Sequence, residues 1–385
     1  MQQAFFTGLS GLLTFSRSLD TISNNIANMN TAGFRGNDVF YRALSHGGEG
    51  VGAQIGGSST RLQAGEIRQT GSSTDLAISG AGYFVLKGEN GNFYTRAGNF
   101  QFDDSGFLID INSGFRVQAL NEGGLLVDVS IDGLETLPPQ ATTAISFAGN
   151  LSTNDATHTV DDVIAYNTEG EQINLSFEFT NNSSVLVGSW NVEVTDENGD
   201  AIGSGEIRFN PDGTPVTDFS SFEGTLPGQV GDIVTFDFGT PDSADGATSN
   251  SGASSTIGAS ADDGYALSGL IGVSFNTEGQ LKLLYSNGDT NDGLQLALAH
   301  FTNEQDLQQV NGAYFRASDN NMPTLGVAGE SLFGEVVGSS LELSNVDLAK
   351  EFADMIIIQR GYQASSRVMS IANQLVEQLY SGSGG

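Results

Sequence analysis

The side chains that could carry out chemistry are few in this sequence and widely separated. The three histidines, His46, His158 and His300, lack the His-x-x-x-His or His-Glu-x-x-His spacing that places two metal ligands on one face of a helix. The sequence has no cysteine, and therefore no thiolate ligand, no cysteine nucleophile and no disulfide. Its many serines lie in Gly/Ser-rich turns. We therefore expect no metal site and no catalytic nucleophile.

Three further patterns only approach known binding motifs. The stretches GVGAQIG (50–56) and GAGYF (80–84) come near the glycine spacing of dinucleotide sites, but neither lies between a strand and a helix. DENGD (196–200) resembles the start of a calcium loop, yet Ala201 and Ile207 stand where that loop needs Gly and Glu. We interpret all three as turns, and we expect no cofactor and no enzymatic activity.

The charge of the chain argues against two kinds of partner, nucleic acid and anionic lipid. A net charge of −32 provides no basic face for nucleic acid and is repelled by anionic lipid. Residues 117–340 hold 32 acidic residues but only Arg208, Lys282 and Arg316 as basic ones. We interpret this acid as a solubilising surface, with specific cation binding as the alternative. No apolar run of about 18 residues predicts membrane insertion, and the N-terminus does not predict a cleaved signal peptide.

The first element that must position a functional surface is a helix near the N-terminus, expected over roughly 4–29. Apolar residues recur there every seven positions in two rows three residues apart, which is the seam of a coiled coil. The seam consists of Phe5, Gly8, Leu12, Phe15, Leu19, Ile22, Ile26 and Met29. Gly33 is a plausible stop.

A second long helix is predicted at the C-terminus, over 346–380. Ser344 or Asn345 can cap it, with Asp347 in the first turn, where negative charge is favoured. Its seam consists of Leu348, Met355, Tyr362, Met369 and Val376, with Ile358, Ser365, Ala372 and Leu379 three positions further on. Gly361 lies within the helix, where glycine costs about 1 kcal/mol relative to alanine.

The residues between the helices predict strands and hairpin turns. The alternation in INLSFEFT (173–180) places Ile173, Leu175, Phe177 and Phe179 on one face of a half-exposed antiparallel strand. Residues 241–263 are small and polar and predict a long loop or a domain connection. The fold class is therefore α+β: a mainly β, multi-domain chain whose terminal amphipathic helices form a coiled-coil-like inner domain. The predicted domains are a terminal helical assembly domain (1–70 with 341–385), an inner β domain (71–141 with 267–340) and an outer acidic β domain (142–266).

Four segments carry a resemblance to a known family. They are ISNNIANMNTAGFR (22–35), TGSSTDLAISGAGYFVL (70–86), YTRAGNFQFDDSGFLID (94–110) and the long C-terminal segment 341–379. Together they resemble the flagellar axial proteins, the family of rod, hook and hook-associated subunits. The motif residues are Asn24, Asn25, Asn28, Thr31, Gly33, Phe34, Ser344, Asn345, Val346, Asp347, Gln359 and Arg360.

The resemblance implies a structural subunit rather than an enzyme. The length of the 142–266 insertion favours a hook-type member, which polymerises into a curved, flexible tube that transmits torque from rod to filament. The alternatives are a distal rod protein of the basal body with an enlarged insertion or, from another class, an acidic β-rich surface adhesin.

The resemblance also implies partners and a location. The partners would be further copies of the chain, the distal rod, the hook cap, the hook–filament junction proteins and the flagellar export apparatus. The location would be extracellular, at the hook and basal body. We expect the terminal helices to be poorly ordered in a free monomer and to fold when neighbours bury their seams.

Overall fold

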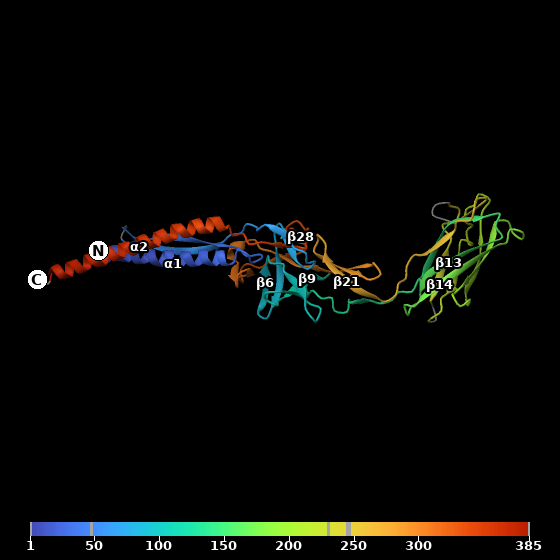
Figure 1. Cartoon of the computed structure of the whole chain (residues 1–385), viewed down its shortest axis with the longest axis horizontal. Helices are drawn as coiled ribbons and strands as arrows, with labels where there is room; N and C mark the ends of the chain where they lie inside the picture. Colours follow the sequence, from blue (N-terminus) through green and yellow to red (C-terminus); the bar gives the residue numbers. More distant parts are fainter. Residues whose placement is uncertain (1, 47–48, 229–231, 244–247, 384–385) are drawn as a thin grey trace. The chain divides into compact units, whose positions relative to one another are not determined.

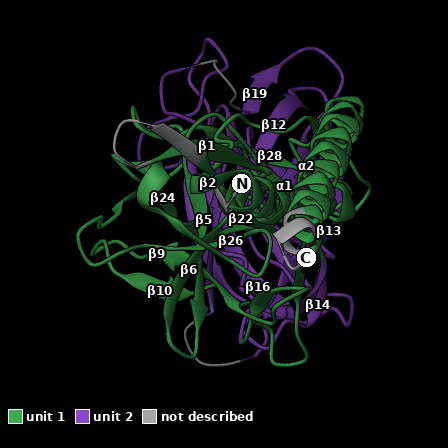
Figure 2. Ribbon diagram, turned by 90° about the vertical axis from the view of Figure 1, so that its left-hand side faces the viewer, with its two compact units in different colours: residues 1–132, 272–283, 290–385 green, residues 133–271, 284–289 purple. Residues whose placement is uncertain are grey.

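The computed structural model describes residues 2–46, 49–228, 232–243 and 248–383, and the chain divides into two compact units. Unit 1 comprises residues 1–132, 272–283 and 290–385, so it contains both ends of the chain (Figure 2). Unit 2 comprises residues 133–271 and 284–289. The division into two units does not test the three predicted domains, which remain a prediction.

Two long helices of unit 1 lie side by side (Figure 1). They are α1 (Gln2–Ala27) and α2 (Leu348–Ser383), close to the predicted bounds. Hydroxyl groups along α1 donate to the carbonyl one turn earlier, as Thr14 does to Ser10 O at 2.7 Å and Ser18 to Thr14 O at 2.9 Å. These polar residues are therefore satisfied within the helix and do not interrupt it. Within the described residues, no helix is long and apolar enough to cross a membrane.

The cap of α2 differs from the prediction. Asp347, and neither Ser344 nor Asn345, caps the helix: its Oδ1 accepts from the backbone N–H groups of Ala349 (2.8 Å) and Lys350 (3.2 Å). A carboxylate there satisfies two free N–H groups and also interacts favourably with the positive end of the helix dipole. The side chain of Asn345 is thereby left for other contacts.

The rest of unit 1 is built from short antiparallel strands. They are β1 (Asn37–His46), β2 (Glu49–Thr60), β3 (Ile67–Gln69), β4 (Leu76–Ser79), β5 (Tyr83–Gly88), β6 (Gly91–Thr95), β7 (Phe100–Phe102), β8 (Leu108–Asp110), β9 (Arg116–Leu120), β10 (Leu126–Asp128), β23 (Thr290–Leu296), β24 (Leu298–His300), β25 (Gln308–Val310), β26 (Tyr314–Arg316), β27 (Thr324–Gly326), β28 (Glu335–Gly338) and β29 (Ser340–Glu342), with a 3-10 turn η1 (Glu304–Asp306).

The strand pairing joins the two ends of the chain within unit 1. The segment after α1 pairs with the segment before α2, through β3 with β29 and β4 with β28. A larger sheet contains the neighbours β23, β9, β5, β6, β26 and β25 in that order. Its core gathers buried aromatic rings, with Tyr83 edge-on to Phe301 and Phe315. Both helices are thus attached to one packed β body.

Unit 2 is a β-sandwich. Its strands are β11 (Thr136–Leu137), β12 (Ala144–Ser152), β13 (Thr157–Tyr166), β14 (Gln172–Asn181), β15 (Ser189–Thr195), β16 (Ala201–Arg208), β17 (Ser221–Thr225), β18 (Ile233–Asp237), β19 (Thr248–Ser251) and β20 (Gly258–Ala261), and the unit boundary passes through β21 (Ser268–Phe275) and β22 (Gln280–Tyr285). One sheet has the order β13-β14-β15-β16, and the other contains β17, β18, β12, β19 and β20. Their inner faces share one core, where Phe147 stacks on Phe238 and meets Phe177 edge-on.

Two sequence predictions can be compared directly with unit 2. The alternation over β14 is confirmed, since Ile173, Leu175 and Phe177 are buried and their neighbours are not. The prediction of one long loop over 241–263 is wrong, because β19 and β20 form there and both pair with β12. Their residues are small, and it is the backbone pairing to a buried strand, rather than side-chain burial, that orders them.

Candidate functional site

The two terminal helices pack closely through small residues. An ideal Cβ at Gly11 would lie 2.6 Å from Ser365 Oγ, and one at Gly8 would lie 3.2 Å from Ser365 O. An ideal Cβ at Gly361 would lie 2.6 Å from Phe15 Cζ. A Cβ at Gly361 would therefore require the Phe15 ring to move, one at Gly8 would require a small shift of the α2 backbone, and one at Gly11 would displace only the Ser365 hydroxyl. Gly361, unfavourable by helix propensity, allows the ring of Phe15 to reach the backbone of α2.

The helix pair covers the predicted seams only in part. Ile22 and Ile358 are buried, and Tyr362 and Val376 are exposed by 46% and 53%. The partly buried seam residues are Phe5, Leu12, Phe15, Leu19, Ile26, Met29, Leu348, Met355 and Met369. The structure therefore buries Ile22 and Ile358 of the two seams and leaves Tyr362 and Val376 of the α2 seam uncovered in this chain.

The helices also present apolar side chains that the heptad pattern did not identify. Each of them is exposed by between 36% and 65%. They are Phe6, Leu9 and Leu13 on α1, and Phe352, Ile356, Ile357, Val368, Ile371 and Leu375 on α2. A single-seam pattern assigns one stripe to each helix, whereas these residues form a second apolar face on each. Contiguous exposed apolar faces of this kind mark protein–protein contact surfaces.

The β1–β2 hairpin lies along α1 and is fixed to it by hydroxyl groups. The single hydroxyl proton of Thr14 is shared between Ser10 O and the carbonyl of Ala53, which lies 2.9 Å from Thr14 Oγ1, and the hydroxyl of Tyr41 donates to Ser18 Oγ at 2.9 Å. The hairpin and α2 thus both pack against α1. Sequence analysis assigned these strands no role, because hydroxyl groups on a helix leave no apolar period.

Asn25 is the member of the asparagine motif that holds the hairpin to the helices. Its side chain is fully buried. Its Nδ2 donates to Asn37 O (2.9 Å) and Glu351 Oε2 (3.2 Å), while its Oδ1 accepts from the backbone N–H of Asn37 (3.0 Å). One amide therefore contacts α1, β1 and α2. Asn24 and Asn30, in contrast, are exposed.

The rest of the N-terminal motif ends the helix and turns the chain. Asn28 Nδ2 donates to the carbonyl of Asn24, and Thr31 Oγ1 donates to Asn28 Oδ1. Gly33 has φ +66°, and a Cβ there would lie 2.2 Å from the backbone nitrogen of Ala97, so only glycine fits without rearrangement. Phe34, next in sequence, is completely buried.

The C-terminal motif meets the N-terminal one at the base of the helices. Asn345 Oδ1 accepts from the backbone N–H of Gly36 (2.8 Å), and its Nδ2 donates to the carbonyls of Arg61 (3.0 Å) and Gln63 (2.8 Å). Val346 packs against Gly36: a Cβ added to Gly36 would lie 3.2 Å from Cγ2 of Val346. The motif residues Ser344, Gln359 and Arg360 are not part of this contact: Ser344 Oγ accepts from the N–H of Val346, and the other two are exposed.

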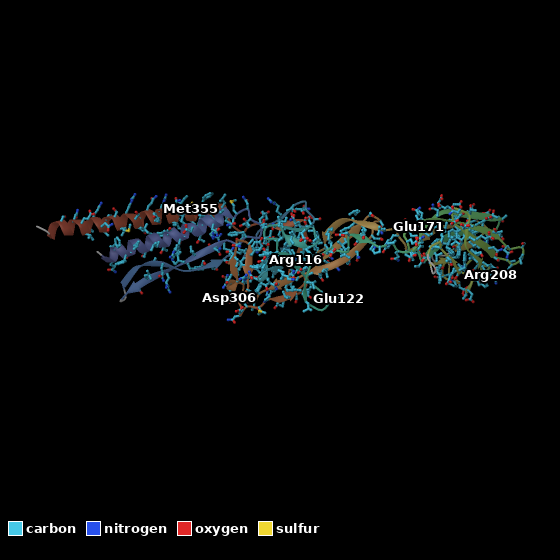
Figure 3. All side chains as sticks on the ribbon, turned by 90° about the horizontal axis from the view of Figure 1, so that it is seen from below. Arg116, Glu122, Glu171, Arg208, Asp306 and Met355 are labelled. Carbon is cyan, nitrogen blue, oxygen red and sulfur yellow. The ribbon has the colours of Figure 1, made fainter. Side chains whose placement is uncertain are left out.

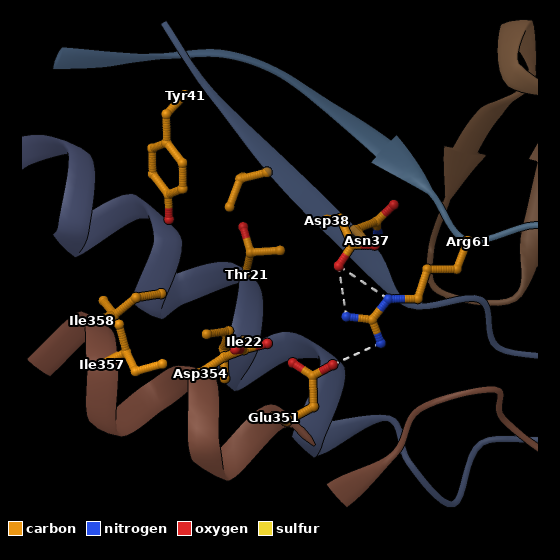
Figure 4. A pocket seen from close by; sticks show the side chains of 11 residues that line it. Thr21, Ile22, Asn37, Asp38, Tyr41, Arg61, Glu351, Asp354, Ile357 and Ile358 are labelled. Atoms are coloured by element: carbon orange, nitrogen blue, oxygen red, sulfur yellow. Dashed lines mark hydrogen bonds and ion pairs between the residues drawn. The ribbon is translucent and has the colours of Figure 1, made fainter. Parts of the chain in front are cut away.

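A chain of ion pairs connects the hairpin to α2. The guanidinium of Arg61 lies 2.7 Å from Asp38 Oδ1 and 2.7 Å from Glu351 Oε1 (Figure 4). The hydrogen bond from Arg61 lowers the pKa of Asp38, and the hydrogen bond to Asp38 raises the pKa of Arg61. Glu351 also accepts from Asn25, so both motifs and the hairpin share one charged network.

A second network is buried more deeply. Arg35 Nη2 lies 2.7 Å from Glu342 Oε1, and Arg96 Nη1 lies 3.5 Å from Glu342 Oε2, with all three side chains at most 6% exposed. Burial lowers the pKa of Arg96, against the attraction of Glu342, which raises it. No spacing pattern in the sequence identifies these residues. The sequence signal available for them was the scarcity of basic residues. In a chain this acidic, each arginine is a candidate for an ion pair.

The arrangement can hold separate segments of the chain together. Within the described residues, no group of three or more His, Asp or Glu side chains could hold a metal ion. At the base of the helices, Arg35 pairs with Glu342 and Arg61 pairs with Glu351, and α1 and α2 carry exposed apolar side chains. The candidate site is therefore a network of hydrogen bonds and ion pairs at the base of two helices, and these helices have uncovered apolar faces.

Comparison with known protein families finds three matching models. Residues 5–35 match the model described as flagella basal body rod protein, and residues 77–161 match the flagellar hook protein FlgE/F/G D1 domain. Residues 337–381 match the flagellar basal body rod FlgEFG protein C-terminal model. The first and third matches contain the two motifs that meet at the base of the helices.

Similar individual proteins extend over the whole chain. A flagellar hook protein FlgE of Treponema pallidum is 28% identical, with 99% of each chain covered, and one of Brucella suis is 29% identical, with 97% of each covered. Among solved structures, the flagellar hook protein FlgE2 of Helicobacter pylori aligns with a TM-score of 0.52 over 71% of this chain and 100% of that one. At 14% identity, that likeness concerns the fold alone.

Proposed function

Because the chain belongs to the flagellar hook and rod protein family, we propose that it acts as a structural subunit of the bacterial flagellar hook and polymerises through its terminal helices. The family is one of structural proteins, so the chain is not an enzyme. Its place is the flagellum. The similar proteins are hook proteins over 97% or more of both chains, which does not favour a distal rod protein or an adhesin.

The observation that supports polymerisation is the uncovered apolar surface of the helix pair. Burying apolar surface contributes about 25 cal/mol per Å², so residues such as Phe6, Leu13 and Ile357 stabilise any contact that covers them. The exposed seam residues Tyr362 and Val376 would contribute in the same way. Left uncovered, this apolar surface would make the chain, whose net charge is −32, prone to aggregation.

The charge of unit 2 suggests the outer position within the polymer. Its sequence contains twenty-two acidic residues and one basic residue, Arg208, which is labelled in Figure 3. Arg208 pairs with Glu206. Hydrated surfaces of like charge slide past one another more readily than interlocked apolar ones. A tube whose stiff centre is made of helices, and whose outer domains carry this charge, could bend while it transmits torque.

The further partners follow from the same role. A hook subunit joins other flagellar components. In this proposal the chain contacts the distal rod at one end of the polymer and the hook–filament junction proteins at the other, and it assembles beneath a hook cap. It would reach that site through the flagellar export apparatus, without a cleaved signal peptide.

The experiment replaces one exposed apolar residue of the helices. We expect Ile357→Asp, at a side chain exposed by 65%, to leave the monomer folded and to prevent polymerisation. The matched control is Val187→Asp in unit 2, where the side chain is exposed by 88%. Sedimentation and electron microscopy of the purified full-length chain report polymer. Normal polymer from Ile357→Asp would contradict the proposal, as would loss of polymer with the control.

A further inference from the structure

A cavity of about 250 Å³ opens where α1, α2 and the β1–β2 hairpin meet (Figure 4). Ile22, Ile357 and Ile358 form its apolar wall. Its volume is many times the ~10–15 Å³ that one water molecule requires. The cavity therefore has room for a side chain, and its apolar wall suits the aliphatic part of a long one.

The charged groups in the cavity leave one carboxylate unpaired. Arg61 is shared between Asp38 and Glu351, so its positive charge is already compensated. Asp354 also lines the cavity, and it forms no ion pair or hydrogen bond within the part of the chain that the structure describes. The lining thus contains three carboxylates and one guanidinium. Such a site favours one further cation.

The chain itself offers suitable cations on the outside of its helices. Among the described residues, four basic side chains of α1 and α2 take part in no ion pair: Arg17, Lys350, Arg360 and Arg367. Lys350 lies close enough to Asp38 of its own chain to help lower that pKa. Arg360 follows the exposed Ile356 and Ile357 by one helical turn, so it presents a guanidinium beside apolar side chains.

We propose that, in the polymer, Arg360 of one copy enters this cavity of a second copy and pairs with Asp354. This rests on the proposed function. The guanidinium can bind a carboxylate through two parallel hydrogen bonds, while its aliphatic stem lies against the isoleucine wall. Ile356 and Ile357 of the incoming helix then cover apolar surface around the cavity mouth. The ion pair fixes the relative position of the two helices in an interface that is otherwise apolar.

The test is a charge exchange in the full-length chain. We expect Asp354→Arg and Arg360→Asp each to raise the concentration needed for polymerisation at least about tenfold, and the double variant to recover to within about threefold of the parent. The matched control combines Asp354→Arg with Arg367→Asp, and no recovery is expected. Circular dichroism of each variant, compared with the parent chain at the same concentration, verifies that the variant keeps the secondary structure of the parent.

The outcomes separate this inference from the proposed function. Polymerisation of Asp354→Arg at the parent concentration, or recovery with Arg367→Asp and not with Arg360→Asp, would overturn the pairing alone. Failure of the parent chain to polymerise would overturn the proposed function as well. If a charge variant does not fold, the cysteine-free chain allows Asp354→Cys with Arg360→Cys and a short thiol crosslinker. A ladder of linked subunits supports the pairing, and its absence from polymer overturns it.

Discussion

Gly361 of α2 packs against the ring of Phe15 of α1, so closely that a Cβ at Gly361 would lie 2.6 Å from Phe15 Cζ. The glycine thus occupies a position where helix propensity disfavours it because the partner helix needs the space. Helix pairs can approach in this way only where one side is small. The same reasoning applies at Gly11 opposite Ser365.

We expect Gly361→Ala to destabilise the helix pair although it improves helix propensity. Alanine gains about 1 kcal/mol of propensity, whereas overpacking against an aromatic ring costs about 1–3 kcal/mol and separates the helices. The measurement is the thermal unfolding of the helical circular dichroism signal. Phe15→Leu in the same chain should restore part of the loss, since it frees the volume. An increase in melting temperature with Gly361→Ala alone would show that the contact is not tight.

Glu342→Gln should destabilise unit 1 strongly. The substitution keeps the size of the side chain but leaves the guanidinium groups of Arg35 and Arg96 buried without a counter-charge. Breaking a buried pair in this way costs about 3–5 kcal/mol. Asp292→Asn is the control, because the pair of Asp292 with Lys282 is largely exposed, and its loss should cost less than about 1 kcal/mol. Equal effects in urea unfolding would rule out a special role for the buried network.

Much of this architecture follows from local patterns, and the rest depends on long-range contacts. The two helices were predictable from their heptads and the strand β14 from its alternation, since both arise from periodic burial. The Arg35–Glu342 pair was not, because its members are 307 positions apart and share no spacing rule. The strands β19 and β20 were missed because residues without bulky side chains leave no apolar period.

Asn25 could be identified from the sequence as part of a motif, but its partners could not. We expect Asn25→Asp to destabilise the helix base by about 2 kcal/mol or more, since it removes the donors to Asn37 O and Glu351 and places a second carboxylate beside Glu351. Asn24→Asp, one residue earlier and exposed, is the matched control and should be nearly neutral. Comparable losses of helical stability in the two variants would contradict this assignment.

Polymer formed by the chain should strengthen with added salt. Unit 2 contains twenty-two acidic residues and one basic residue, so outer domains brought together in a polymer repel one another. Raising the ionic strength from about 0.01 M to 0.15 M shortens the Debye length from about 30 Å to 8 Å and screens this repulsion. The concentration required for polymerisation should fall accordingly. A rise instead would indicate that ion pairs between subunits, and not apolar contacts, dominate assembly.

The pair of Asp38 with Arg61 makes the hairpin contact sensitive to acid. The hydrogen bond from Arg61 lowers the pKa of Asp38 below 3.8, so the folded state binds this proton less readily than the unfolded state. The resulting stabilisation is complete above about pH 4 and is lost as the pH falls through the lowered pKa. Asp38→Asn should therefore be less stable at neutral pH and show a shallower loss of melting temperature as the pH falls below about 4. The control is Asp104→Asn, at an exposed carboxylate without an ion pair among the described residues, which should keep the slope of the parent chain.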